Sequence, residues 1–65
     1  MTVEEIAARV KQIRNASGDD DRASFLEGEL FHDVLREVAA GAENPAALAT
    51  AALKSWRIHF DRCRY

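Results

Sequence analysis

The longest regular pattern of apolar and polar positions lies in residues 23–40. Apolar side chains recur there at every third or fourth position, and Phe31 and Leu35 widen the stripe, which consists of Ala23, Leu26, Leu30, Val34 and Val38. This spacing places the stripe on one face of an α-helix, and adjacent apolar pairs within the segment break the alternation that a strand requires. We therefore predict a helix over residues 21–40.

The ends of this helix carry their own signals. Asp20 or Asp21 can cap the start, because a carboxylate accepts hydrogen bonds from the free backbone N–H groups of a first turn. Gly41 stands where a left-handed residue commonly ends a helix. Gly28 lies in the helix interior, where glycine costs about 1 kcal/mol relative to alanine. Close approach of a neighbouring helix is one reason for a glycine at this position.

Two further helices are predicted, over residues 3–15 and 45–55. Thr2 followed by Glu5 forms a capping-box pattern, after which apolar residues recur at helical spacing. Asn44 followed by Pro45 is a strong start signal, since the N–H group that proline lacks has no partner in a first turn anyway. The segment that follows Pro45 is rich in alanine, and small side chains let helix axes approach closely.

The last segment, residues 56–65, changes its period. Trp56, Ile58 and Phe60 alternate with polar residues, which indicates an extended chain with one buried face. The alternative is that the preceding helix continues and frays. We favour the extended tail because it supplies aromatic side chains to a core that is poor in them. The expected fold is a single all-α domain over residues 1–65, a three-helix bundle with the C-terminal tail packed across it.

Length and composition restrict the class of protein. Sixty-five residues suffice for one small domain. Cys63 is the sole cysteine, so no disulfide can form within the chain. The first residues lack the pattern of a signal peptide, and no apolar run reaches the roughly 20 residues of a membrane span. These features predict a cytoplasmic protein.

Charge is distributed unevenly along the chain. Residues 17–43 contain eight acidic residues and two arginines, a net charge of −6, whereas residues 54–65 carry +3. Glu29, Asp33 and Glu37 are spaced by four and form an acidic stripe opposite the apolar one. An acidic centre argues against direct binding of nucleic acid, which requires clustered basic residues. It favours a protein partner with a basic surface, and the predicted partner-binding residues are Asp19, Asp20, Asp21, Glu29, Asp33 and Glu37.

No set of residues predicts catalysis, a cofactor or a metal site. Glu29 and His32 have the Glu-x-x-His spacing of di-iron bundles, but those need two such motifs. A surface salt-bridge cluster with Arg36 explains the pair better.

The three consecutive aspartates lack the alternating oxygen ligands of a calcium loop. Cys63 has His59 four residues before it but no visible oxyanion hole. The basic tail, with its interleaved aromatic residues, could contact single-stranded nucleic acid. Pairing with the acidic helix of the same or a neighbouring molecule explains it better. We predict a protein that is not an enzyme.

Residues 19–62 resemble a group of small uncharacterised helical proteins of bacterial and phage genomes. The matching positions are Asp20, Asp21, Glu27, Leu30, Val34, Leu35, Leu48, Ala49, Ala52, Leu53, Ile58, Phe60 and Arg62. Such proteins often end in Arg-Trp-Cys, whereas here Cys63 follows Arg62 directly. The resemblance implies phage or mobile-element cargo, and it does not indicate a biochemical function.

Two functions are consistent with these features. The first is an inhibitor of a bacterial defence complex, similar in style to anti-CRISPR proteins, whose acidic face imitates nucleic acid at a basic groove of a CRISPR or other defence effector. The second is a structural or regulatory helical module that homodimerises or belongs to a larger assembly. An exposed apolar patch would favour the second function, and a bare acidic ridge would favour the first.

Overall fold

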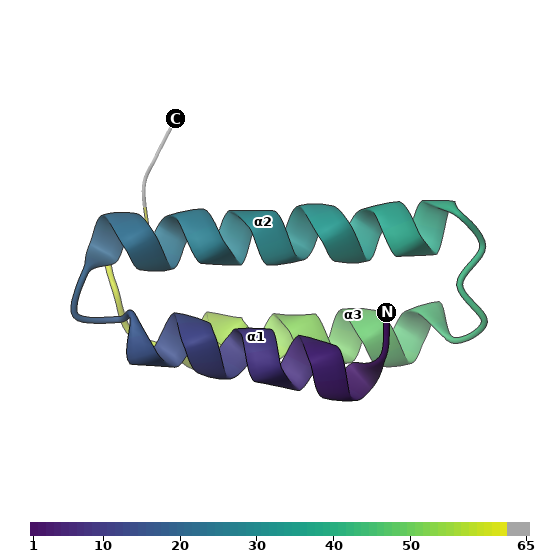
Figure 1. Cartoon of the computed structure of the whole chain (residues 1–65), viewed down its shortest axis with the longest axis horizontal. Coiled ribbons are helices and arrows are strands. Elements are labelled where there is room, and N and C mark those ends of the chain that lie inside the picture. The colour runs from purple at the N-terminus through teal and green to yellow at the C-terminus, as the bar shows by residue number, and fades with distance from the viewer. Residues whose placement is uncertain (63–65) are drawn as a thin grey trace.

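Three helices pack side by side in the computed structural model, which describes residues 1–62 (Figure 1). They are α1 (Val3–Asn15), α2 (Asp20–Ala39) and α3 (Pro45–Leu53), and a 3-10 turn, η1 (Lys54–Arg57), follows α3. Helices α1 and α3 run in the same direction and α2 runs against both. The predicted all-α three-helix bundle is confirmed, and residues 1–62 contain no strand. Within the same residues, no helix is both long and apolar enough to cross a membrane.

The predicted N-terminal caps of α1 and α3 are both present. The hydroxyl of Thr2 accepts a hydrogen bond from the N–H of Glu5 at 3.1 Å, and the carboxylate of Glu5 accepts one from the N–H of Thr2 at 3.0 Å. The side-chain oxygen of Asn44 accepts from the N–H of Ala47 at 3.3 Å. These bonds satisfy backbone donors that the helices themselves leave without partners. Local chemistry therefore sets where both helices begin.

Helix α2 begins one residue earlier than predicted, because a different aspartate caps it. Asp19 is the N-cap, and its carboxylate accepts a hydrogen bond from the N–H of Arg22 at 3.2 Å. The prediction of Asp20 or Asp21 as the cap was wrong. Gly41 ends the helix as predicted, with a positive φ of 93°. The N–H of Gly41 bonds to Val38 and that of Ala42 bonds to Glu37, the two bonds of a Schellman motif.

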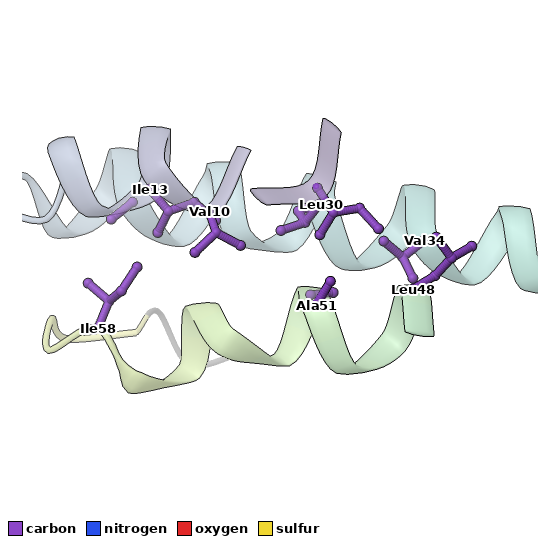
Figure 2. Packing of buried hydrophobic residues seen from close by; sticks show 10 residues of the cluster. Val10, Ile13, Leu30, Val34, Leu48, Ala51 and Ile58 are labelled. Carbon is purple, nitrogen blue, oxygen red and sulfur yellow. The ribbon is translucent and has the colours of Figure 1, made fainter. Parts of the chain in front are cut away.

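One apolar core lies between the helices, and all three contribute to it (Figure 2). Its buried members are Ile6, Val10, Ile13, Ala23, Leu30, Val34, Leu48, Ala51, Ala52 and Ile58. Most of the predicted stripe of α2 faces this core, with Leu26, Phe31 and Val38 partly buried at its edge. Leu35, which was expected to widen the buried stripe, is 67% exposed. The apolar face of α2 is thus wider than the surface that α1 and α3 cover.

The tail crosses the bundle but begins later than predicted. Residues 54–57 form the 3-10 turn η1, and the extended backbone starts at Ile58, which is buried. The prediction that Trp56 belongs to the buried face was wrong, since its side chain is 61% exposed. The tight turn interrupts the two-residue alternation and places Ser55, instead of Trp56, in the interior. Ile58 and the half-buried Phe60 follow the predicted pattern, whereas Cys63 and the prediction for it lie outside the described residues.

Gly28 does not serve the close packing that we expected. Apart from its chain neighbours and the nearby backbone of α2, no heavy atom lies within 4 Å of the position that a Cβ atom of residue 28 would take. No neighbouring helix therefore approaches Gly28 closely. The same holds for Gly41, but there the positive φ disfavours any residue with a side chain. The two glycines therefore differ in backbone conformation and not in the space around them.

Opposite effects on stability are expected when each of these glycines is replaced by alanine. Gly28→Ala should raise the free energy of unfolding by about 1 kcal/mol, because alanine fits a helix interior better. Gly41→Ala should lower it by about 1 to 2 kcal/mol, because the left-handed conformation strains alanine. Urea denaturation followed by circular dichroism measures both. A destabilised Gly28→Ala variant would mean that Gly28 has a partner that the bundle does not show.

Candidate functional site

Two carboxylates of the predicted acidic stripe are paired with the N-terminal part of the chain. Asp33 Oδ2 accepts a hydrogen bond from Nη1 of Arg9 on α1 at 2.8 Å. The amino group of Met1 lies 3.4 Å from Oε1 of Glu37. Glu29, the third member, is exposed. The stripe is therefore not a bare ridge, because Asp33 is paired with α1 and Glu37 with the N-terminal amino group.

The three aspartates at the start of α2 are distant from the far end of this stripe. Asp21 and Glu37 are sixteen residues apart along one helix, which corresponds to about 24 Å. Asp19 caps the helix, and Asp20 Oδ1 accepts a hydrogen bond from the N–H of Asp61 in the tail at 3.2 Å. The structure thus brings the six predicted partner-binding residues together only in smaller groups. Asp33 and Glu37 line one hollow, and Glu29 and Asp33 line the next.

His32 lies beside Asp33 and not in the predicted cluster with Glu29 and Arg36. Its Nδ1 is 3.5 Å from Oδ1 of Asp33, and its side chain is largely exposed. The hydrogen bond from Arg9, followed by that from His32, holds the pKa of Asp33 below its ordinary value of 3.8. Among residues 1–62, no group of three or more His, Cys, Asp or Glu side chains is placed to hold a metal ion.

A buried carboxylate near the middle of α2 is the feature that sequence reasoning missed. Glu27 is only 5% exposed, although its side chain carries a carboxyl group. Arg62 of the tail reaches it with two parallel bonds, Nε to Oε1 at 2.8 Å and Nη2 to Oε2 at 3.0 Å. The hydroxyl of Ser55 donates a further bond to Oε2 at 2.8 Å. Hydrogen bonds thus join α2 to η1 and to the tail, and the backbone of Asp61 adds contacts with Asp20 and Ser24.

Two aromatic rings complete the surroundings of Arg62. Its guanidinium carbon lies 4.1 Å from the centroid of the Trp56 ring and 4.2 Å from that of Phe60. Both distances are well within the range of cation–π attraction. The predicted pairing of the basic tail with the acidic helix therefore occurs within the chain. It also occupies Trp56 and Arg62, two of the residues that could otherwise contact nucleic acid.

A signal for Glu27 was present in the sequence. Ala23, Glu27, Leu30 and Val34 are spaced by four, three and four, so a charged residue occupies a position of the buried stripe. A carboxylate there requires a cation, because an unpaired buried charge is strongly unfavourable. The sequence does not say which basic residue supplies it, since Arg62 is 35 residues away.

An uncharged groove separates α2 from α3 on the outside of the bundle. We call it the α2–α3 groove; it has a volume of about 250 Å³ and is lined by Phe31, Val34, Leu35, Ala49, Ala52 and Leu53. Leu35 and Leu53 are 67% and 61% exposed. Exposed leucines on facing sides of one groove form a patch of the kind that marks interaction surfaces. The groove is a second candidate site, separate from the acidic stripe.

Removing Arg62 is expected to destabilise the fold more than replacing both members of its ion pair. Arg62→Ala leaves the buried carboxylate of Glu27 without its cation and should cost about 3 kcal/mol of unfolding free energy. Changing Glu27 and Arg62 together to Met should cost less than Arg62→Ala alone, because no buried charge then remains unpaired. Chemical denaturation of both variants measures this. A loss below about 1 kcal/mol for Arg62→Ala would show that water reaches Glu27.

Asp33 is expected to titrate at lower pH than an ordinary aspartate. Its pKa is lowered in the folded state, so its stabilising effect is present above its ordinary pKa of 3.8 and is lost as the pH falls through the folded pKa. Carboxyl chemical shifts in an NMR titration report the midpoint. Arg9→Met should move the midpoint of Asp33 back towards 3.8. A midpoint at or above 3.8 in the unaltered chain would contradict the contact with Arg9.

Known proteins offer no relative with which these two sites can be compared. No protein-family model, curated protein or solved structure matches the chain. The resemblance to small phage and bacterial helical proteins therefore stays a prediction.

Proposed function

We propose that this chain is a non-catalytic helical module that associates with a second copy of itself through the α2–α3 groove. One observation carries the proposal: Leu35 and Leu53 stand largely exposed on either side of a groove whose lining has no charged residue. Burial of such side chains is the main favourable contribution to protein association.

The absence of charge in the groove favours a second copy over a basic partner. In a twofold-symmetric contact the same patch supplies both sides, so a net charge in the patch would face a charge of the same sign in the other copy. The six lining residues are aliphatic or aromatic and avoid that repulsion. A partner with a basic surface would instead require carboxylates in the contact, and the groove offers none.

The size of the patch indicates a weak dimer. Burying the exposed parts of Leu35 and Leu53 is worth about 1 to 2 kcal/mol for each leucine, or roughly 4 to 8 kcal/mol for the four leucines of a pair. Lost translational and rotational freedom opposes this gain, although contacts around the groove add to it. A dissociation constant in the micromolar range or weaker is consistent with these magnitudes. Association should therefore depend on protein concentration.

Inhibition of a bacterial defence complex through the acidic face stays a prediction with less geometric support. The carboxylates of Asp19, Asp20, Asp33 and Glu37 already have partners within the chain. A basic groove on another protein would have to compete with Arg9 and with backbone N–H groups for these oxygens. Charged contacts of this type contribute more to the rate and specificity of association than to affinity.

Sedimentation velocity over a range of protein concentrations tests the proposed dimer. The unaltered chain should shift from monomer to dimer, whereas Leu35→Ser and Leu53→Ser should each weaken association at least tenfold, which corresponds to about 1.4 kcal/mol. Both side chains are largely exposed, so the fold should lose little stability.

Phe25→Ser is the matched control, because Phe25 is 64% exposed on α2 but does not line the groove. It should leave association unchanged. A chain that stays monomeric at millimolar concentration would contradict the proposal. So would a dimer that Phe25→Ser dissociates and Leu35→Ser does not, because the contact would then lie on another face of α2.

A further inference from the structure

The guanidinium group of Arg62 lies in a site that offers acceptors to each of its three nitrogen atoms. Glu27 accepts two parallel bonds from Nε and Nη2, at 2.8 and 3.0 Å. Backbone oxygens of Ser55 and Ile58 accept from Nη2 at 3.2 and 3.3 Å, and that of Phe60 lies 3.5 Å from Nη1. This arrangement matches the planar fork of arginine, which offers several donors in fixed directions.

The rings of Trp56 and Phe60 make the site selective for a flat cation. Each ring centroid is about 4 Å from the guanidinium carbon, and a delocalised planar cation stacks on such faces. An ammonium group has no plane to stack and cannot make two parallel bonds to one carboxylate. Lysine would therefore fill this site poorly, although it carries the same charge.

Other contacts hold the tail in place independently of the Arg62 side chain. Ile58 is buried in the core. The backbone of Asp61 is held on both sides, because its N–H donates to Asp20 at 3.2 Å and its carbonyl accepts from the hydroxyl of Ser24 at 3.3 Å. Most of the site belongs to Glu27 and to residues 55–60, so it should persist when the arginine side chain leaves.

The site is also reachable from solvent. The side chain of Arg62 is 23% exposed, and Trp56, which forms one wall, is 61% exposed. Glu27 beneath them is almost completely buried and requires a cation. Departure of Arg62 would therefore leave a strong preference for another guanidinium group in the same place.

We propose that Glu27, Ser55, Trp56, Ile58 and Phe60 form an arginine-recognition site, which Arg62 occupies within the chain and an arginine side chain of a partner polypeptide can occupy in its stead. Arg62 acts as an internal ligand that keeps the site closed to weak competitors, because a tethered group has an effective concentration in the millimolar range. A partner arginine must therefore be presented at high local concentration. This inference does not depend on self-association through the α2–α3 groove.

Rescue of an Arg62 variant by a small arginine derivative tests the site. Thermal unfolding of Arg62→Ala is measured with increasing N-acetyl-arginine amide up to tens of millimolar. The midpoint should rise by a few degrees and then level off, as expected for one site that binds the folded state. N-acetyl-lysine amide at equal concentration is the matched ligand and should give a much smaller rise.

Two further variants keep the test decisive. Arg62→Lys retains a cation beside Glu27 and should fold if Arg62→Ala does not; it should still gain stability from the arginine derivative. Combining Glu27→Gln with Arg62→Ala removes the carboxylate and should abolish the response. Absence of a saturable, arginine-selective rise in both single variants would overturn the proposal, as would an equal rise in the double variant.

Discussion

The carboxylate of Glu27 lies on the buried face of α2, and the fold must supply it with a cation and hydrogen-bond donors. Arg62 and Ser55 do so, and both come from the segment after α3. A buried charge without a partner is unfavourable by several kcal/mol, so the tail has one strongly preferred position. This requirement, together with the burial of Ile58 and the hydrogen bonds of the Asp61 backbone, explains why a segment without regular secondary structure crosses the bundle in a defined way. It also explains the 3-10 turn, which directs Ser55 towards Glu27 and leaves Trp56 outside to stack on Arg62.

Three carboxylates at or near the surface also have partners within the chain, although burial does not demand them. Asp33 bonds to Arg9 of α1, Asp20 bonds to the tail, and Asp19 caps α2, so charges that look like a surface for a partner in the sequence hold elements of the fold together. A stripe spaced by four residues gives the position of side chains around one helix. It gives no information on which other helix lies beside them. The pairing of Asp33 with Arg9 places a basic group of α1 beside the acidic stripe of α2.

Local signals predicted the helices almost residue by residue, because capping boxes, an Asn-Pro start and a terminal glycine act over three or four positions. Thr2 with Glu5, Asn44 with Pro45, and Gly41 all occupy the predicted roles. Features that depend on distant residues were missed. The alternation of Trp56, Ile58 and Phe60 suggested a strand-like tail from residue 56, but Ser55 is drawn inward by Glu27, which lies 28 residues earlier. Leu35 was assigned to the core because the width of a helical stripe does not reveal how much of it the other helices cover.

Surfaces that the fold does not use are the best indicators of function in a chain this small. Glu27 and Arg62 satisfy each other, and loss of either one alone is costly to the fold, so their presence alone does not require a partner. Leu35 and Leu53 contribute little to the buried core, yet they stand exposed on opposite sides of one uncharged groove. Exposed apolar side chains at such positions lower solubility and gain nothing for the isolated bundle. The proposed association through this groove would bury both side chains, which folding alone does not.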